Sequence, residues 1–297
     1  MKQTQATGYL LALFGMLMLS FTLIALKFGL ESFSPIVMSF GRVIPASIVA
    51  FAVLKISGAK LLPPREDLGR VLGLTIGVVI AFPVITSFTV QHIHVGEAGV
   101  IQALSSLITA TISIFYGHKH PGLRFWLASA VGTVAAMGFA ITRSAASTAS
   151  GDLLWYGLML LAVILWAWGQ VTGGTLTGKH HSIHILAWAI LIGTPINALV
   201  TITDLVANPI TAWPTIGAWF GFLYVSLVSM FLVFFIWYAA MDRIGVAKTS
   251  QFQLAQPVAT LILSIWLLGE VVPPSTWVFA AVIIAAVAWS QSAGRKS

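Results

Sequence analysis

Long apolar stretches separated by short polar connections constrain this chain more than any other feature. Ten such stretches can be counted, each about 20 residues long, and a helix of that length crosses the ~30 Å hydrocarbon core of a bilayer. We therefore predict ten transmembrane helices. Their approximate ranges are residues 8–29, 34–56, 68–90, 96–117, 123–142, 153–175, 183–206, 216–240, 246–268 and 275–293.

The composition excludes a soluble fold. The chain is 58% hydrophobic and 8% charged, whereas soluble domains carry about 25% charged residues. Because the stretches are too long for barrel strands, the predicted fold class is an all-α integral membrane protein. The net charge of +7 does not indicate nucleic-acid binding, since the basic residues lie at span ends. The chain has no cysteine, and we expect no disulfide, metal site or cofactor.

A polar stripe occurs twice in the chain. In the span 246–268 it comprises Gln253, Gln256, Thr260 and Ser264, which share one helix face. Its counterpart 151 residues earlier comprises Gln102, Ser105, Thr109 and Ser113, with Ser106 at the position of Pro257. We predict two five-helix repeats, residues 1–146 and 147–297, around a central cavity.

The distribution of basic residues predicts the orientation. Of the 15 Lys and Arg residues, 12 fall on one side of the ten-span arrangement and two on the other, while Arg42 lies within the second span. This asymmetry places both termini in the cytoplasm. Because each repeat has an odd number of spans, the second enters the membrane inverted. Transporters commonly use such inverted repeats, with the substrate site near mid-membrane at the repeat interface.

The ninth span ends with Leu267-Leu268-Gly269-Glu270 and contains Pro257. Together with the ten spans and the two repeats, this pattern resembles the EamA-type branch of the drug/metabolite transporter superfamily, in particular bacterial aromatic amino-acid exporters. The resemblance implies an inner-membrane protein that works by alternating access. It also implies a cavity built mainly from the first, third, fourth, sixth, eighth and ninth spans. The first repeat departs from the signature, because Gly117-His118-Lys119 aligns with Leu268-Gly269-Glu270.

Mid-depth polar and aromatic residues of those six spans are the candidate substrate-binding residues. They are Ser20, Phe21, Phe82, Gln102, Ser106, Trp166, Trp168, Tyr224, Ser226, Gln253 and Gln256. Glutamine both donates and accepts hydrogen bonds, which suits an amino-acid zwitterion, and aromatic rings suit an aromatic side chain. The alternative is that the polar stripes are interhelical hydrogen bonds that fix the fold. Pro83 and Pro257 are candidate hinges, or bends required by packing.

The charged residues bear on the mechanism. All eight carboxylates are predicted at or near span ends, which leaves no mid-membrane acid for a proton relay. We therefore expect a facilitator or exchanger that exports aromatic or neutral amino acids. Sugar phosphates, nucleobases, organic cations and drugs are alternative substrates, and the oligomeric state is left open. We interpret Arg42 as an ion-pair partner or a snorkelling side chain rather than a carboxylate ligand.

Histidines provide the enzyme hypothesis. His118 and His120, with His180, His181 and His184, resemble the clusters of membrane di-iron oxygenases. Against this, other histidines fall on the opposite face of the membrane, and an oxygenase has no need of an inverted repeat. We therefore expect no enzymatic activity. A non-transporting membrane scaffold is the third function class.

Overall fold

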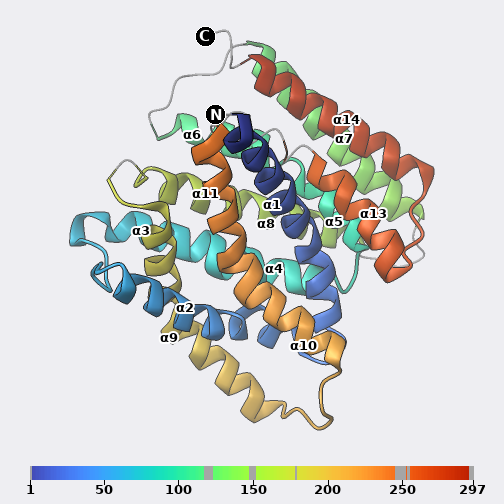
Figure 1. Ribbon diagram of the computed structural model, residues 1–297. Coiled ribbons are helices and arrows are strands. Elements are labelled where there is room, and N and C mark those ends of the chain that lie inside the picture. The colour runs from blue at the N-terminus through green and yellow to red at the C-terminus, as the bar shows by residue number, and fades with distance from the viewer. Residues whose placement is uncertain are drawn as a thin grey trace.

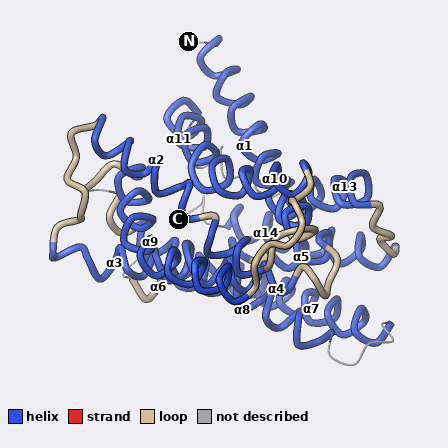
Figure 2. The backbone as a smooth tube through the Cα atoms, turned by 90° about the horizontal axis from the view of Figure 1, so that it is seen from below, coloured by secondary structure: helices blue, strands red, loops and turns tan. Residues whose placement is uncertain are grey.

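The computed structural model describes residues 2–116, 123–146, 152–177, 179–244, 252 and 255–293. Within these residues every regular element is a helix, as the tube in Figure 2 shows. The first half contains α1 (Lys2–Gly29), η1 (Val37–Gly41), α2 (Val43–Ile56), η2 (Arg65–Asp67), α3 (Leu68–Leu74), η3 (Thr75–Ala81), α4 (Phe82–Thr89), α5 (Val95–Gln102), α6 (Ser105–Ile114) and α7 (Leu123–Ala146). The second half contains α8 (Asp152–Gly174), α9 (Ser182–Ala207), α10 (Ile216–Leu223), η4 (Tyr224–Leu232), α11 (Val233–Ile244), α13 (Gln256–Leu268) and α14 (Pro274–Ala293).

Seven continuous helical stretches within the described residues are long and apolar enough to cross a membrane. Three shorter apolar stretches, Trp126–Ala135, Gln256–Leu268 and Pro274–Ala286, lie in the fifth, ninth and tenth predicted spans. The predicted all-α membrane fold is confirmed. The number of crossings stays a prediction, because the last three stretches are too short by themselves.

Several predicted spans are not uninterrupted α-helices. The elements η1, η3 and η4 are π-helical, and the fourth span breaks between α5 and α6. Pro257 lies in the first turn of α13, where a missing N–H leaves few bonds unmade, whereas Pro83 follows the π-helical η3 inside the continuous stretch Arg65–Thr89 and removes a donor there. Hydropathy predicted the positions of the spans, but it does not report these changes in the hydrogen-bonding pattern.

The helices pack in pairs that join the two halves of the chain (Figure 1). Helix α1 packs against α10, η4, α11 and α13, while α8 packs against α3, η3, α4 and α6. Helices α7 and α14 form a pair at one side of the molecule, and α2 and α9 form another at the opposite side. The interior is therefore bordered by α1, α8 and their partners.

A glycine contact sets the closest approach of α8 to η3. A Cβ atom placed on Gly77 would collide with the carbonyl oxygen of Leu165, and one on Gly169 would lie 3.0 Å from a methyl carbon of Val78. Small residues let membrane helices approach closely enough for backbone van der Waals contact. Gly77 and Gly169 thus form a close packing contact between η3 and α8.

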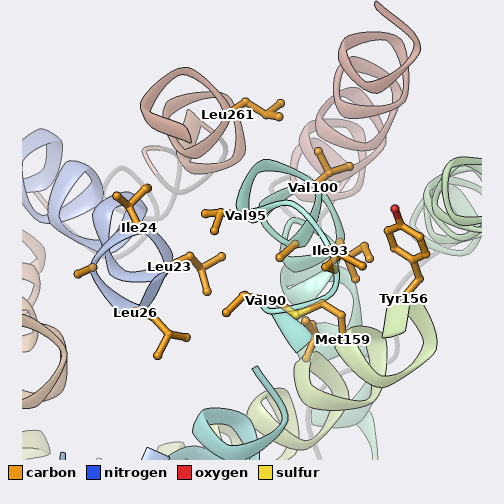
Figure 3. Packing of buried hydrophobic residues seen from close by; sticks show 14 of the residues in the cluster. Leu23, Ile24, Leu26, Val90, Ile93, Val95, Val100, Tyr156, Met159 and Leu261 are labelled. Carbon is orange, nitrogen blue, oxygen red and sulfur yellow. The ribbon is translucent and has the colours of Figure 1, made fainter. Parts of the chain in front are cut away.

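Apolar side chains of four helices form a buried cluster (Figure 3). Leu23 and Ile24 of α1 lie near Val95 of α5, with Leu261 of α13 above them and Met159 of α8 on the opposite side. All five side chains are buried. This cluster fixes the relative positions of the helices that carry most of the candidate site residues.

Candidate functional site

One group of candidate residues lies where α1 meets η4 and α13. The Phe21 and Tyr224 rings meet edge to face at 4.9 Å between centroids, and the Tyr224 hydroxyl donates to the Met18 carbonyl at 2.8 Å. The Ser20 hydroxyl is fully buried and lies 2.9 Å from the Met16 carbonyl and 3.4 Å from the Gln256 carbonyl. The structure therefore brings Ser20, Phe21, Tyr224 and Gln256 together.

A second group joins α4 to α8. The Phe82 and Trp166 rings have centroids 6.3 Å apart, and both side chains are partly exposed. Trp168 is not part of this group, because its indole N–H donates to the Tyr116 hydroxyl at 3.0 Å, beyond the end of α6. Trp166 and Trp168 are two positions apart and so lie on different faces of α8.

The remaining candidates differ in how their polar groups are used. Ser226 is buried and donates to the Phe222 carbonyl at 2.6 Å, one turn away on its own segment. Gln102, the last residue of α5, is partly buried, and its amide has no hydrogen bond within the described part of the chain. The same holds for the Gln256 amide. Gln253 and the Ser106 side chain lie outside the described residues.

The lower part of the second polar stripe packs against other helices. The Thr260 hydroxyl lies 3.3 Å from the Ser20 carbonyl, and its side chain is in contact with Gly99 of α5. Ser264 donates to the Leu261 carbonyl at 3.0 Å and borders Gly96. Thr260 forms an interhelical hydrogen bond and Ser264 packs against α5, so the described part of the stripe divides into two packing residues and one amide, Gln256, without a hydrogen bond among the described residues.

The Leu-Leu-Gly-Glu signature forms a cap between the two halves. Gly269 ends α13 in the left-handed conformation (φ 65°), which is favourable for glycine. The next residue, Glu270, accepts hydrogen bonds from the backbone N–H groups of Val95 (2.7 Å) and Gly96 (3.0 Å), at the start of α5. Its role could not be read from the sequence, because the partners lie 175 and 174 residues away.

The environment of Glu270 favours its ionised form. Burial of the carboxylate acts to raise its pKa, but hydrogen bonds from His94 and from the Gly96 and Val95 N–H groups outweigh burial and lower the pKa below its ordinary value. The N-terminus of α5 adds the positive end of a helix dipole. A second carboxylate, Glu97, is buried in the first turn of the same helix, and Tyr156 donates to it at 2.6 Å.

An acidic pocket of about 360 Å³ lies between the α1–η1 connection and the C-terminal end of α9. Its charged lining residues are Glu31 and Asp204, and it also includes Ser34, Asn208 and Trp213. Asp204 is 8% exposed and accepts hydrogen bonds from Ser34 (2.6 Å) and Asn208 (3.1 Å). Sequence reasoning missed this pocket because its lining comes from two segments, residues 31–37 and 204–213, that are far apart in the sequence.

Arg42 contradicts the interpretation given to it from the sequence. It connects η1 to α2 and is 7% exposed, so the guanidinium does not snorkel to the surface. Its Nε atom is buried without a partner, and its side chain forms no hydrogen bond or ion pair within the described residues. The ion-pair interpretation is wrong for the described part of the chain, because none of its ion pairs includes Arg42.

The described histidines have structural contacts. His180 is paired with Asp67 (2.9 Å), and the His92 ring stacks on Trp155 with centroids 3.8 Å apart. His181 and His184 lie edge to face at 5.6 Å. Within the described residues, no group of three or more His, Cys, Asp or Glu side chains could hold a metal ion. His118 and His120 lie outside them.

Comparison with known proteins identifies the family. The profile of the EamA-like transporter family matches residues 6–141 and again 153–290. The chain belongs to the EamA-like transporter family. This confirms the resemblance to the drug/metabolite transporter superfamily that the sequence pattern predicts.

Relatives of this EamA-like transporter span nearly its whole length. It is 30% identical over 282 residues to "Uncharacterized transporter YdeK" of Bacillus subtilis, covering 94% of each chain. It is 25% identical to "Uncharacterized inner membrane transporter YedA" of Escherichia coli K12, covering 94% of this chain and 90% of YedA. The "Probable terminal-alkyne amino-acid exporter" of Streptantibioticus cattleyicolor is 25% identical, with 89% and 86% covered.

The fold is also shared with a solved structure described as "Crystal structure of protein". The TM-score is 0.63 at 16% identity, and the match covers 95% of this chain and 97% of the other. At that identity the likeness shows the fold alone. The family membership and the apolar helices together make this protein a membrane transporter rather than a soluble protein.

Proposed function

We propose that this EamA-like transporter exports aromatic and other neutral amino acids across the bacterial inner membrane by alternating access. The main support for this proposal is a pair of aromatic contacts, Phe21 with Tyr224 and Phe82 with Trp166. Each joins the first predicted span of one half to the third predicted span of the other. Rings arranged in this way offer apolar faces for an aromatic side chain from both halves of the chain.

Three observations support an inverted repeat around this interior. The family profile matches each half separately. Helix α6 begins at Ser105 and α13 at Gln256, 151 residues later, while η3 ends at Ala81 and η4 at Leu232, again 151 residues later. The packing of α1 with α13 corresponds to that of α8 with α6. We propose Pro83 and Pro257, which follow these interruptions, as hinge positions.

The amides support an amino-acid substrate. Gln102 and Gln256 have no hydrogen bond within the described residues, so both can bind a ligand that supplies donors and acceptors. One relative carries the name of a probable amino-acid exporter. Among the described acids, Glu97 lies in the first turn of its helix and Asp204 in the last turn, which supports a facilitator or exchanger rather than a proton-relay pump.

Counterflow in proteoliposomes tests the proposal. Vesicles loaded with unlabelled phenylalanine should accumulate labelled phenylalanine when they contain the transporter, and empty vesicles should not. Alanine, a sugar phosphate and a nucleobase serve as competitors in the same assay. Failure of every amino acid to exchange would refute the proposed substrate class.

An organic cation is a second candidate substrate. The acidic pocket with Glu31, Asp204 and an exposed indole, Trp213, is suited to a positive charge through ionic and cation–π attraction. Competition by a quaternary ammonium compound in the counterflow assay distinguishes an organic-cation substrate from an amino acid. Strong competition that Asp204→Asn abolishes would favour the cation, and its absence would favour the zwitterion.

A further inference from the structure

Arg42 is the one described basic side chain that is both buried within a membrane span and without a partner. Lys27, near the end of α1, donates to the Val90 carbonyl at 2.8 Å, and Arg243 donates to the Ala239 carbonyl at 2.7 Å. Arg42 has no such contact within the described residues, and its Nε atom is fully buried. Guanidinium stays protonated in proteins, so the charge cannot be lost by deprotonation.

An uncompensated buried charge is costly, and inside a membrane protein it marks a functional site by default. The cost is removed when an anion binds, because a guanidinium can form two parallel hydrogen bonds with a carboxylate. None of the ion pairs formed by described residues involves Arg42, so no described carboxylate competes for this position. The Arg42 guanidinium is therefore available to an anionic ligand.

Arg42 lies five residues after Val37, on the segment that borders the acidic pocket, although Arg42 itself does not line it. Val37 and Asp204 line that pocket. Gly41, four residues after Val37, borders Thr201 of α9, because a Cβ on Gly41 would lie 3.3 Å from the Thr201 methyl carbon. Arg42 follows directly. The segments packed against η1 and α2 are α4, α9 and η4, and η4 also carries Tyr224.

A second buried polar atom without a partner lies on α9. Asn197 is fully buried, its amide nitrogen donates to the Gly193 carbonyl at 2.6 Å, and its Oδ1 atom has no donor within the described residues. It is one helical turn from Thr201, the residue that Gly41 borders. The Arg42 Nε atom and the Asn197 Oδ1 atom are thus two buried polar atoms without a hydrogen-bond partner within the described residues.

We propose that Arg42 binds the carboxylate of the transported molecule, and that the substrate class is therefore carboxylate-bearing. This rests on the proposed export of amino acids and assigns a residue that sets specificity within it. Arg42 then selects against amines that have no carboxylate. A carrier of organic cations would have no use for an unpaired buried guanidinium.

The experiment compares three ligands that share a phenyl ring: phenylalanine, its primary amide and phenylpropionate. Wild-type protein in proteoliposomes should exchange phenylalanine, be inhibited by phenylpropionate, and discriminate against the amide by at least ten-fold. If no amino acid is exchanged, the proposed function fails. If phenylalanine and its amide are exchanged equally, the function stands and the role of Arg42 is overturned.

Variants test whether Arg42 causes the preference for phenylalanine over its amide. Arg42→Met should reduce phenylalanine exchange at least ten-fold and bring the acid-to-amide ratio close to one, whereas Arg42→Lys should restore part of the preference. Arg243→Met removes a cation that already has a partner, and it should leave the ratio unchanged. Undiminished preference for the acid in folded Arg42→Met would overturn the inference.

Thermal unfolding separates binding from a structural role. Removal of an uncompensated buried charge should leave the melting temperature of empty Arg42→Met equal to or above that of wild type. Phenylpropionate should raise the melting temperature of wild type but not of the variant. A large loss of melting temperature in both Arg42→Met and Arg42→Lys, with an unchanged acid-to-amide ratio, would show that Arg42 is structural.

Discussion

Glu270 caps the helix that begins at Val95, and this contact links the end of α13 to the start of α5 across 175 residues of sequence. Two backbone N–H groups that a helix leaves without intrahelical partners are satisfied by one carboxylate. The side chain is 8% exposed, so water is a poor substitute. The acidic residue of the family signature therefore has a structural explanation that needs no direct contact with substrate.

Glu270→Ala should lower the free energy of unfolding by about 1–3 kcal/mol at neutral pH, because buried donors lose their acceptor. The folded pKa of Glu270 lies below its unfolded value of about 4.3. Its stabilisation is thus complete above that value and is lost as pH falls through the folded pKa. Melting curves of wild type and variant should converge in acid. Glu66→Ala, which removes an exposed carboxylate, should show no such convergence.

The sequence predicted the positions of the spans because the bilayer imposes length and apolarity on each helix separately. The sequence did not predict which distant segments are in contact. The Glu270–Val95 bond, the acidic pocket and the unpaired state of Arg42 all depend on which helices become neighbours. Arg42 shows the limit clearly, since its depth could be read from the sequence but the absence of an acid beside it in the described chain could not.

The sequence predicted only part of the candidate site, because it does not show which helix faces become neighbours. Depth in the spans placed Phe21, Trp166 and Tyr224 near the middle of the membrane, and the structure pairs all three with rings from the other half of the chain. Trp168 was included on depth alone, although it lies on another face of α8 and bonds to Tyr116. Periodicity separates two faces of one helix but does not tell which face borders the interior.

Gly77→Ala should destabilise the protein by about 1–3 kcal/mol, because the added Cβ meets the Leu165 carbonyl of α8 and the helices must separate. Gly69→Ala is the matched control on α3, where a Cβ meets no atom within 4 Å. It should be neutral or stabilising, since alanine favours a helix by about 1 kcal/mol. Melting temperatures in one detergent decide the matter, and equal effects would contradict the close crossing.

The absence of native cysteine makes single-cysteine labelling a direct test of the proposed inverted topology. Cysteines at Gly294 and Ser57 should react with an impermeant maleimide only from the cytoplasm, and one at Ser147 only from outside. The measurement compares whole cells with inverted vesicles. Reaction of Ser57 and Ser147 from the same side would rule out five spans in each half.

Trp166→Ala should weaken phenylalanine exchange about five-fold more than alanine exchange, since ring stacking contributes about 1 kcal/mol beyond area burial. Tyr224→Ala should act in the same direction. Trp266→Ala removes an indole that is 78% exposed on α13 and serves as the control. Apparent affinities for both amino acids are measured by counterflow, and equal losses for the two would make the rings structural.

The glutamines and the hydroxyls of the polar stripes should separate by phenotype. Gln102 and Gln256 have no hydrogen bond within the described residues, so Gln102→Leu and Gln256→Leu should preserve the melting temperature. Each should reduce phenylalanine affinity about ten-fold, because the bound zwitterion is left with an unpaired polar group worth about 1–3 kcal/mol.

Thr260→Val gives the opposite expectation, because its hydroxyl links α13 to the Ser20 carbonyl and is 2% exposed. It should lower the melting temperature, and exchange per folded molecule should be retained. Gln253→Leu, at a position outside the described residues, tests whether the repeat extends to function and should match Gln102→Leu. Normal exchange by well-folded Gln102→Leu and Gln253→Leu would remove both amides from the substrate site, and the stripes would then serve only to hold the helices together.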